Sequence, residues 1–132
     1  MNPRWAAVPA AILVMLCAGC GWQVEGQAAQ DVVTGFVAAV DAEDGDAACE
    51  SLADTAVEML ETSDSDCATV VLDLDLPTSH DVRDVEVWGR AALVVTADDV
   101  VFLALVDGQW KIRAAGCEPD PPEPYDCTVD GS

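Results

Sequence analysis

Apolar residues in the first half of the chain recur at the spacing of an α-helix. Five of them fall one, three or four positions apart and form one apolar face: Val32, Val33, Phe36, Val37 and Val40. This pattern predicts a first helix that ends near Gly45. Residues 21–28 precede the pattern and are expected to form a short tether, so we expect the folded domain to span residues 29–132.

Two short helices are predicted after the first one. Asp46 is placed to cap a second helix that contains Cys49 and Leu52. Thr55 and Glu58 have the spacing of a capping box, in which the hydroxyl and the carboxylate each accept a hydrogen bond from a free backbone N–H. These two residues therefore predict the start of a third helix.

A fourth helix is predicted to begin at Ser63 or Asp64. Its apolar positions again recur at helical spacing, and they are Cys67, Val70, Val71 and Leu74. Pro77 should end this run, because proline lacks the backbone N–H that continues a helix.

From residue 82 onward the apolar positions alternate with their neighbours, which is the pattern of β-strands. Four strands are predicted, around residues 85–88, 91–95, 101–105 and 110–114. Asp107-Gly108 is a strong hairpin signal, because a type I′ turn needs two residues that tolerate positive φ. We therefore predict an α+β domain in which three to four N-terminal helices pack on a four-stranded antiparallel sheet.

The N-terminus has the features of a secretory signal peptide over residues 1–19. Arg4 supplies a positive charge, residues 6–16 form an uncharged apolar run, and small residues precede Cys20. We therefore expect the chain to be exported.

The segment from Leu16 to Cys20 resembles the lipobox of bacterial lipoproteins, in which the cysteine becomes the first mature residue and is diacylated on sulfur. Cys20 is the match, whereas Cys17 stands where the lipobox favours leucine. The resemblance implies a lipid-anchored protein on the extracytoplasmic side of the cell membrane, with residues 20–28 as a lipidated tether. The alternative is an uncleaved anchor, because residues 5–24 contain no charge and are just long enough to span a bilayer.

The composition limits the classes of partner. The chain of 132 residues carries 25 acidic and 5 basic residues, a formal charge of −20 at pH 7. Nucleic acids and anionic headgroups recruit basic patches, so this balance argues against both as partners. A hydrophobic content of 52% is too high for a disordered acidic tail, so we expect one compact domain.

The cysteines predict two disulfides. Six are present, and four remain once Cys17 leaves with the signal peptide and Cys20 is acylated. In an oxidising compartment four cysteines form two bonds, for which three pairings are possible. The pairing that we favour staples successive predicted helices and a stiff C-terminal loop: Cys49 with Cys67, and Cys117 with Cys127. No Cys-x-x-Cys pair remains and the chain has one histidine, so we expect no zinc site, redox centre or cofactor.

The segment VFLALVDGQWKIRAAGC, residues 101–117, resembles the closing hairpin of cone-shaped domains of the nuclear transport factor 2 type. Gly108, Trp110, Lys111 and Ile112 carry this resemblance. The whole chain, including the C-terminal PYDC, is similar to secreted lipoproteins of high-GC actinobacteria. The resemblance implies a reduced cone, and the enzymes among such domains place a carboxylate, histidine or tyrosine in an apolar cavity.

Few residues are candidates for facing a ligand. His80 lies in the predicted loop between helices and sheet, and Tyr125 lies in the proline-rich C-terminal segment. Residues 79–81 read Ser-His-Asp, but adjacent side chains point apart and a catalytic triad is assembled from distant positions. Trp88 and Trp110 lie on predicted strands, where a tryptophan either stacks on a ligand or packs in the core. No catalytic constellation is identifiable.

The acidic segment 41–50 invites comparison with a calcium loop. Asp41, Glu43 and Asp46 offer oxygen ligands, but an EF-hand loop beginning at Asp41 needs glycine at position 46 and an acid at position 52. The chain has Asp46 and Leu52 there. We therefore expect an acidic helix junction and no metal site.

Three functions are compatible with these features. The first is a non-enzymatic, membrane-anchored module of the cell envelope that binds a basic partner protein through its sheet face or acidic surface. The second is a small-molecule binder or isomerase-like enzyme with an enclosed apolar cavity. The third is a cation buffer of the envelope.

The lipid anchor is tested by replacing Cys20 with alanine. The substitution removes the sulfur that carries the acyl chains, so the Cys20→Ala chain should leave the membrane fraction and lack acyl mass. Cell fractionation and mass spectrometry of the first mature residue measure both properties. Continued retention in the membrane fraction would favour the uncleaved anchor over residues 5–24.

Overall fold

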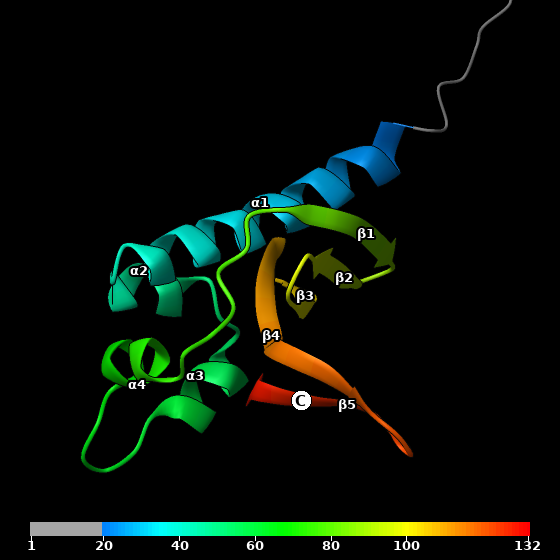
Figure 1. Ribbon diagram of the computed structural model, residues 1–132. Helices are drawn as coiled ribbons and strands as arrows, with labels where there is room; N and C mark the ends of the chain where they lie inside the picture. Colours follow the sequence, from blue (N-terminus) through cyan, green and yellow to red (C-terminus); the bar gives the residue numbers. More distant parts are fainter. Residues whose placement is uncertain (1–19) are drawn as a thin grey trace, which may run out of the picture.

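The computed structural model describes residues 20–132, and in this part of the chain four helices pack on a five-stranded antiparallel sheet (Figure 1). The predicted α+β class is confirmed. The expected signal peptide, residues 1–19, lies outside the described residues. Among the helices of residues 20–132, none is long and apolar enough to cross a membrane.

The first helix starts earlier than the apolar pattern indicates. α1 (Cys20–Asp41) extends through residues 20–28, for which the sequence predicts a tether. Contacts with the sheet account for the difference. Nε1 of Trp110 donates to Oε2 of Glu25 at 3.0 Å, and Gly26 lies against the side chain of Val85. Tertiary packing stabilises helical turns that have too few apolar residues to show a periodicity.

α2 (Gly45–Glu50) follows a tight turn. Its cap is Asp44, whose carboxylate accepts a hydrogen bond from the N–H of Ala47 at 3.1 Å, and the expected cap Asp46 lies inside the helix. Several aspartates in this acidic segment could serve as the N-cap according to the sequence. The position of the preceding turn determines that Asp44 is the one that caps α2.

α3 (Asp54–Leu60) begins without the expected capping box. Its N-cap is Ala53, which makes no side-chain hydrogen bond, and Glu58 is exposed. The hydroxyl of Thr55 donates instead to the carbonyl of Gly131 at 2.6 Å. A residue that was expected to serve its own helix therefore holds the C-terminal end of the chain.

α4 (Cys67–Asp73) begins three to four residues later than expected. Asp66 caps it by accepting from the N–H of Thr69 at 2.9 Å, whereas Ser63 and Asp64 lie in the preceding loop. This backbone hydrogen bond lowers the pKa of Asp66.

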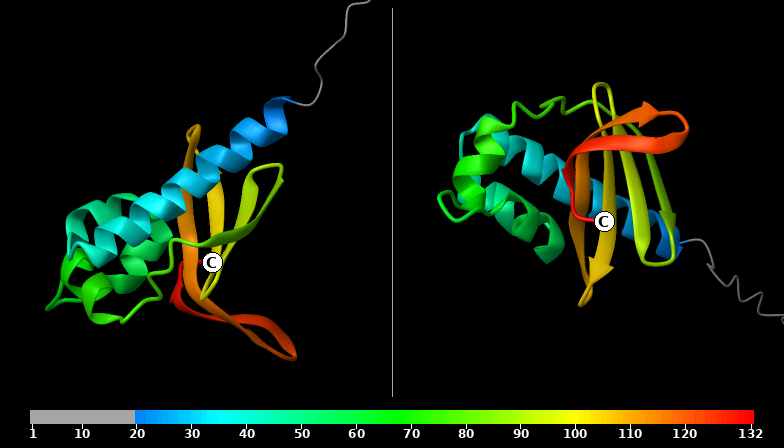
Figure 2. Two further views of the ribbon diagram at one scale, coloured as in Figure 1. Left: turned by 45° about the horizontal axis from the view of Figure 1, so that its top comes forward. Right: turned by 90° about the horizontal axis from the view of Figure 1, so that it is seen from below.

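The sheet is a meander in which strands adjacent in sequence are adjacent in space. The four predicted strands are present, and the structure adds a fifth. They are β1 (Val82–Trp88), β2 (Ala91–Thr96), β3 (Val100–Val106), β4 (Gln109–Asp120) and β5 (Glu123–Asp130). Figure 2 shows α1 crossing one face of this sheet while the hairpin of β4 and β5 extends away from the helices.

The fifth strand corrects the prediction of a stiff C-terminal loop. β4 continues to Asp120, β5 begins at Glu123, and Cys117 lies directly opposite Cys127 in the ladder. Four prolines in this segment hide the alternation by which strands are recognised. The disulfide between the opposed cysteines joins the two strands and compensates for the backbone hydrogen bonds that the prolines cannot donate.

Both disulfides of the structure have the pairing that we favoured. One is the bond within the β4–β5 hairpin, and the other joins Cys49 of α2 to Cys67 of α4. Each closes a loop in the unfolded chain, and bonds of this kind typically stabilise a domain by about 2–4 kcal/mol.

The core lies between the helices and the sheet. Its fully buried large side chains come from α1, α4 and the strands β2 to β5, and they are Val33, Val71, Val94, Val101, Leu103, Ile112 and Val129. The segment between α2 and α3 joins the sheet directly. The N–H of Ile112 donates to the carbonyl of Ser51 at 2.9 Å, and its carbonyl accepts from the N–H of Ala53 at 2.7 Å.

α2 and α4 approach too closely for a side chain at Gly45. A Cβ added there would overlap the backbone of Ala68, whereas one added at Gly35, on the exposed side of α1, would meet nothing within 4 Å. We expect Gly45→Ala to lower the free energy of unfolding by about 1–3 kcal/mol through overpacking. The matched control Gly35→Ala should raise it by about 0.5–1 kcal/mol, because alanine loses less backbone entropy.

Denaturant titration of both variants with the disulfides intact measures this difference. Equal stabilisation by the two alanines would contradict the close contact between α2 and α4.

Candidate functional site

An open groove of about 720 Å³ lies where the helical layer meets the start of β4. Its walls come from α1, α2, the start of α3 and the turn between β3 and β4. The apolar side chains include Ala28, Val32, Leu52 and Val57. It is larger than the two hollows beside the β4–β5 hairpin, which measure about 390 and 330 Å³.

The charged groups of the groove are mostly acidic. Glu50 and Asp54 are exposed residues that line it, and Glu25 lies close by because its carboxylate accepts from the indole of Trp110. Lys111 is the cation in the lining, and its Nζ donates to the backbone carbonyl of Glu50 at 2.6 Å. The groove therefore combines apolar walls with a field that attracts positive charge.

One residue of β4 that lines the groove directs its backbone groups away from β3. Alternate residues of an antiparallel strand hydrogen-bond to opposite sides, and Ile112 already uses its N–H and carbonyl on the side away from β3. Trp110 is two residues earlier, so its N–H and carbonyl face the same side. Outside the β3–β4 ladder, neither group has a backbone partner among residues 20–132. Backbone groups left over at a strand edge are a template for another extended chain.

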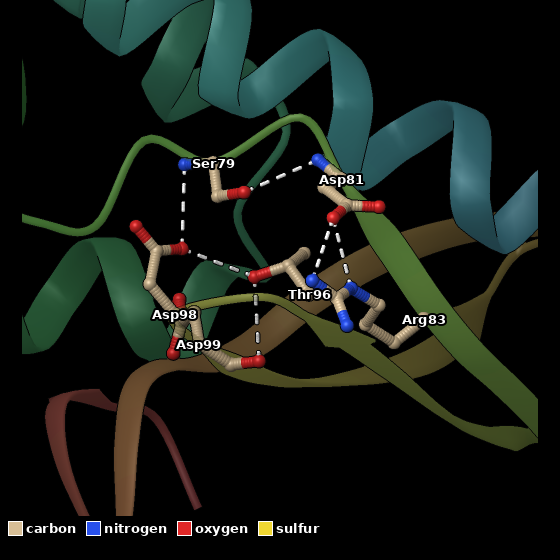
Figure 3. Close-up of polar contacts among 6 residues, drawn as sticks. All are labelled: Ser79, Asp81, Arg83, Thr96, Asp98 and Asp99. Atoms are coloured by element: carbon tan, nitrogen blue, oxygen red, sulfur yellow. Dashed lines mark hydrogen bonds and ion pairs between the residues drawn. The ribbon is translucent and has the colours of Figure 1, made fainter.

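The residues 79–81 form a structural cluster and no catalytic one (Figure 3). The hydroxyl of Ser79 accepts from the N–H of Asp81 at 3.2 Å, and the carboxylate of Asp81 forms an ion pair with Arg83 at 2.8 Å. His80, between them in the sequence, is exposed. The side chains of Ser79 and Asp81 therefore fix the loop that enters β1.

The same close-up shows how the turn between β2 and β3 is held. Oδ1 of Asp98 accepts from the N–H of Ser79 at 3.3 Å, and the hydroxyl of Thr96 lies 3.2 Å from the same oxygen. The loop before β1 and the β2–β3 turn are thereby joined by one carboxylate.

The candidate ligand-facing residues do not come together. Trp110 is 5% exposed, faces α1 and lines the groove, whereas Trp88 is 49% exposed and lies on the opposite face of the sheet. Tyr125, 37% exposed, packs its ring edge against Phe102 at a centroid distance of 5.1 Å. His80 lies in the loop before β1. The two tryptophans lie on opposite faces because they stand at opposite phases of the pleat.

Asp99 is the carboxylate with the most unusual environment. Its oxygens accept from the N–H groups of Val100, Gly116 and Cys117 at 2.7, 3.1 and 3.0 Å. Burial nevertheless raises the pKa of Asp99, and the nearby charge of Asp98 adds to this effect. Asp99 thus joins the β2–β3 turn to the strand that carries the second disulfide.

The acidic residues do not form a metal site in the part of the chain that the structure describes. Within residues 20–132, no group of three or more His, Cys, Asp or Glu side chains is arranged to hold a metal ion. Asp41, Glu43 and Asp46, which we compared with a calcium loop, are all exposed.

Comparison of the chain with protein-family models, with curated proteins and with solved structures finds no match. The resemblances to lipoproteins and to cone-shaped domains therefore stay predictions, and the chemistry of the site has to be argued from this chain alone.

The sequence pattern did not reveal the groove. Of its residues only Trp110 was a candidate, and its role as a backbone donor and acceptor depends on which side of β4 is already paired. Leu52 was expected within the second helix, whereas the structure places it after the end of α2, where it is buried.

The role of Asp99 is tested by replacing it with asparagine. An amide would place an N–H group opposite the N–H of Gly116, so we expect Asp99→Asn to lower the free energy of unfolding by about 1–3 kcal/mol. The matched control is Asp107→Asn, which removes the same charge from an exposed turn whose positive φ suits asparagine.

The pH dependence follows from the raised pKa of Asp99. Between its unfolded and folded pKa values the native state binds more protons than the unfolded state, so the contribution of Asp99 to stability decreases as pH rises through that range. The stability difference between the wild type and Asp99→Asn should therefore grow as pH falls from about 7 to about 4. Urea titrations across this range measure it, and a constant difference would contradict the shifted pKa.

Proposed function

We infer that this protein is a lipid-anchored, extracytoplasmic binding module of the cell envelope, which holds part of a partner protein in the groove beside Trp110. The observation that carries this function is the groove itself. It is apolar on its walls and acidic at its rim, and it is open enough for a chain segment to enter from solvent.

The position of the groove suits a membrane anchor. α1 begins at Cys20 and its residues Ala28 and Val32 form one wall of the groove. The side chain of Glu25 is bonded to Trp110 on the facing wall. The residue that would carry the lipid is therefore joined to the binding site through one continuous helix.

The charge of the chain favours a basic partner. Four of its five cations lie within the described residues, on or beside the sheet: Arg83, Arg90, Lys111 and Arg113. Lys111 and Arg90 are bound to backbone carbonyls, and Arg83 is paired with Asp81. Complementary charge on a partner accelerates its association and relieves the repulsion among the carboxylates.

An enzyme of the isomerase-like class is supported less well. Such an enzyme needs an enclosed apolar cavity that contains an acid or base of shifted pKa. The groove is open, and Asp99, whose pKa is raised, lies near the β4–β5 hairpin and outside the lining of the groove. A reduced cone in which the sheet bends around α1 remains our proposal for the fold family, and it is compatible with a binding role.

Site-specific crosslinking in intact cells tests this function. A photo-crosslinking amino acid at Gln109, on the exposed rim of the groove, should capture one partner protein. The same amino acid at Thr34, on the exposed side of α1, is the matched control. Neutralising the rim with Glu50→Gln and Asp54→Asn should reduce the crosslink several-fold, because exposed charge pairs each contribute up to about 1 kcal/mol.

Glu58→Gln is the control for charge, because Glu58 is exposed on α3 away from the groove lining. Equal crosslinking from Gln109 and Thr34, or equal loss with Glu58→Gln, would count against partner binding in the groove.

A further inference from the structure

We propose that the groove takes a short extended segment of the partner protein, which adds as a strand to β4 at Trp110 and places a basic side chain beside Glu50 and Asp54. This proposal rests on the proposed function, because it states what kind of segment the groove holds. The alternative occupants, a helix of the partner or a small molecule, are outcomes of the test below.

The backbone of Trp110 is the feature that selects an extended segment. Trp110 lines the groove, its N–H and carbonyl point away from β3, and neither has a backbone partner outside the β3–β4 ladder among residues 20–132. An extended chain offers both a donor and an acceptor along one edge, as in other cases of strand addition. A helix uses its backbone groups internally, so it would leave those of Trp110 without partners in a less hydrated site.

The chain already contains one example of this pairing. Residues 51–53 run parallel to β4 and form a β-bridge between Leu52 and Ile112. The carbonyl of Ser51 and the N–H of Ala53 occupy both backbone groups of Ile112. α2 ends directly before this segment, so the extended pairing with β4 does not continue to Trp110. A partner segment at Trp110 would continue the line of this internal segment.

The local structure limits the segment to a few residues. Gly108 lies in the turn before β4, and Ile112 is already paired, so Trp110 is the position open to strand addition. Two hydrogen bonds alone give little net affinity, since each replaces a bond to water. Most of the binding free energy must come from burial against the apolar walls, for which Val32 and Val57 are available.

The charges at the rim select a basic side chain. Glu50 and Asp54 both line the groove, two residues before and two residues after Leu52 in the sequence. The ammonium of Lys111 is engaged by the carbonyl of Glu50 at 2.6 Å, which leaves both carboxylates available. A lysine or arginine of the segment would therefore meet two carboxylates, whereas an acidic side chain would be repelled.

Synthetic peptides distinguish strand addition from other modes of binding. The probe is an acetylated and amidated pentapeptide with the sequence valine-threonine-lysine-threonine-valine, added to the full-length lipidated chain in detergent micelles. Isotope-edited NMR follows the backbone N–H of Trp110. We expect its hydrogen exchange to slow at least about tenfold at saturating peptide, because pairing in a strand protects an amide.

N-methylation of the peptide removes individual N–H donors and so tests the backbone pairing directly. Alternate N–H groups of an extended chain face opposite sides, so N-methylation of the lysine and N-methylation of both threonines cannot have the same effect. We expect one version to bind like the parent peptide and the other to bind at least about tenfold more weakly, which is the effect of about 1.4 kcal/mol. Glutamate in place of the lysine should also weaken binding.

A filled groove provides a second test. Ala28→Trp should block peptide binding by occupying the groove, whereas Thr34→Trp, on the exposed side of the same helix, should not. Equal binding of both N-methylated peptides, or unchanged exchange at Trp110 with the crosslinked partner in place, would overturn strand addition. The crosslink from Gln109 would persist in that case, so the proposed function and this inference fail separately.

Discussion

The two backbone hydrogen bonds of Ile112 join the helical layer to the sheet, and the rest of the structure depends on them. They bring the short segment between α2 and α3 onto the edge of β4, which would otherwise be open along its first half. This segment fixes the position of α2 and α3 relative to the sheet. Because it pairs with only one residue of the strand, it does not pair with the neighbouring Trp110. The groove is therefore a direct product of the contact that closes the core, and a change in that contact would alter both.

The large negative charge determines how this small domain is stabilised. Repulsion among 25 acidic residues favours an expanded chain, and few cations are present to offset it. The disulfides offset part of this repulsion, since one joins α2 to α4 and the other joins the two strands of an acidic hairpin. Backbone N–H groups that donate to carboxylates offset another part. Asp44 and Asp66 cap helices, and Asp99 accepts three N–H groups where an unpaired carboxylate would be costly.

The sequence predicts the elements of this fold better than their ends and better than the site. The alternation of Val101, Leu103 and Leu105 identified a central strand, because one face of such a strand must be buried. The start of α1 could not be predicted, since Glu25 is helical through a bond to Trp110 that lies far away in the sequence. Prolines concealed β5 because they remove the pattern that marks a strand. The groove was missed for a different reason. Its lining comes from several separate elements, and the direction of the Trp110 backbone groups follows from the register of β4 and not from any side chain.

If Cys20 carries the proposed lipid anchor, the continuous helix from Cys20 to the groove limits the distance between the membrane surface and the site. At a rise of about 1.5 Å per residue, Ala28 stands about 12 Å and Val32 about 18 Å along the axis from the residue that would be acylated. A continuous helix of this length would hold the groove within a narrow range of distances from the headgroups, whereas a flexible linker would sample many. An anchored protein would then capture partners that expose their docking segment close to the membrane surface.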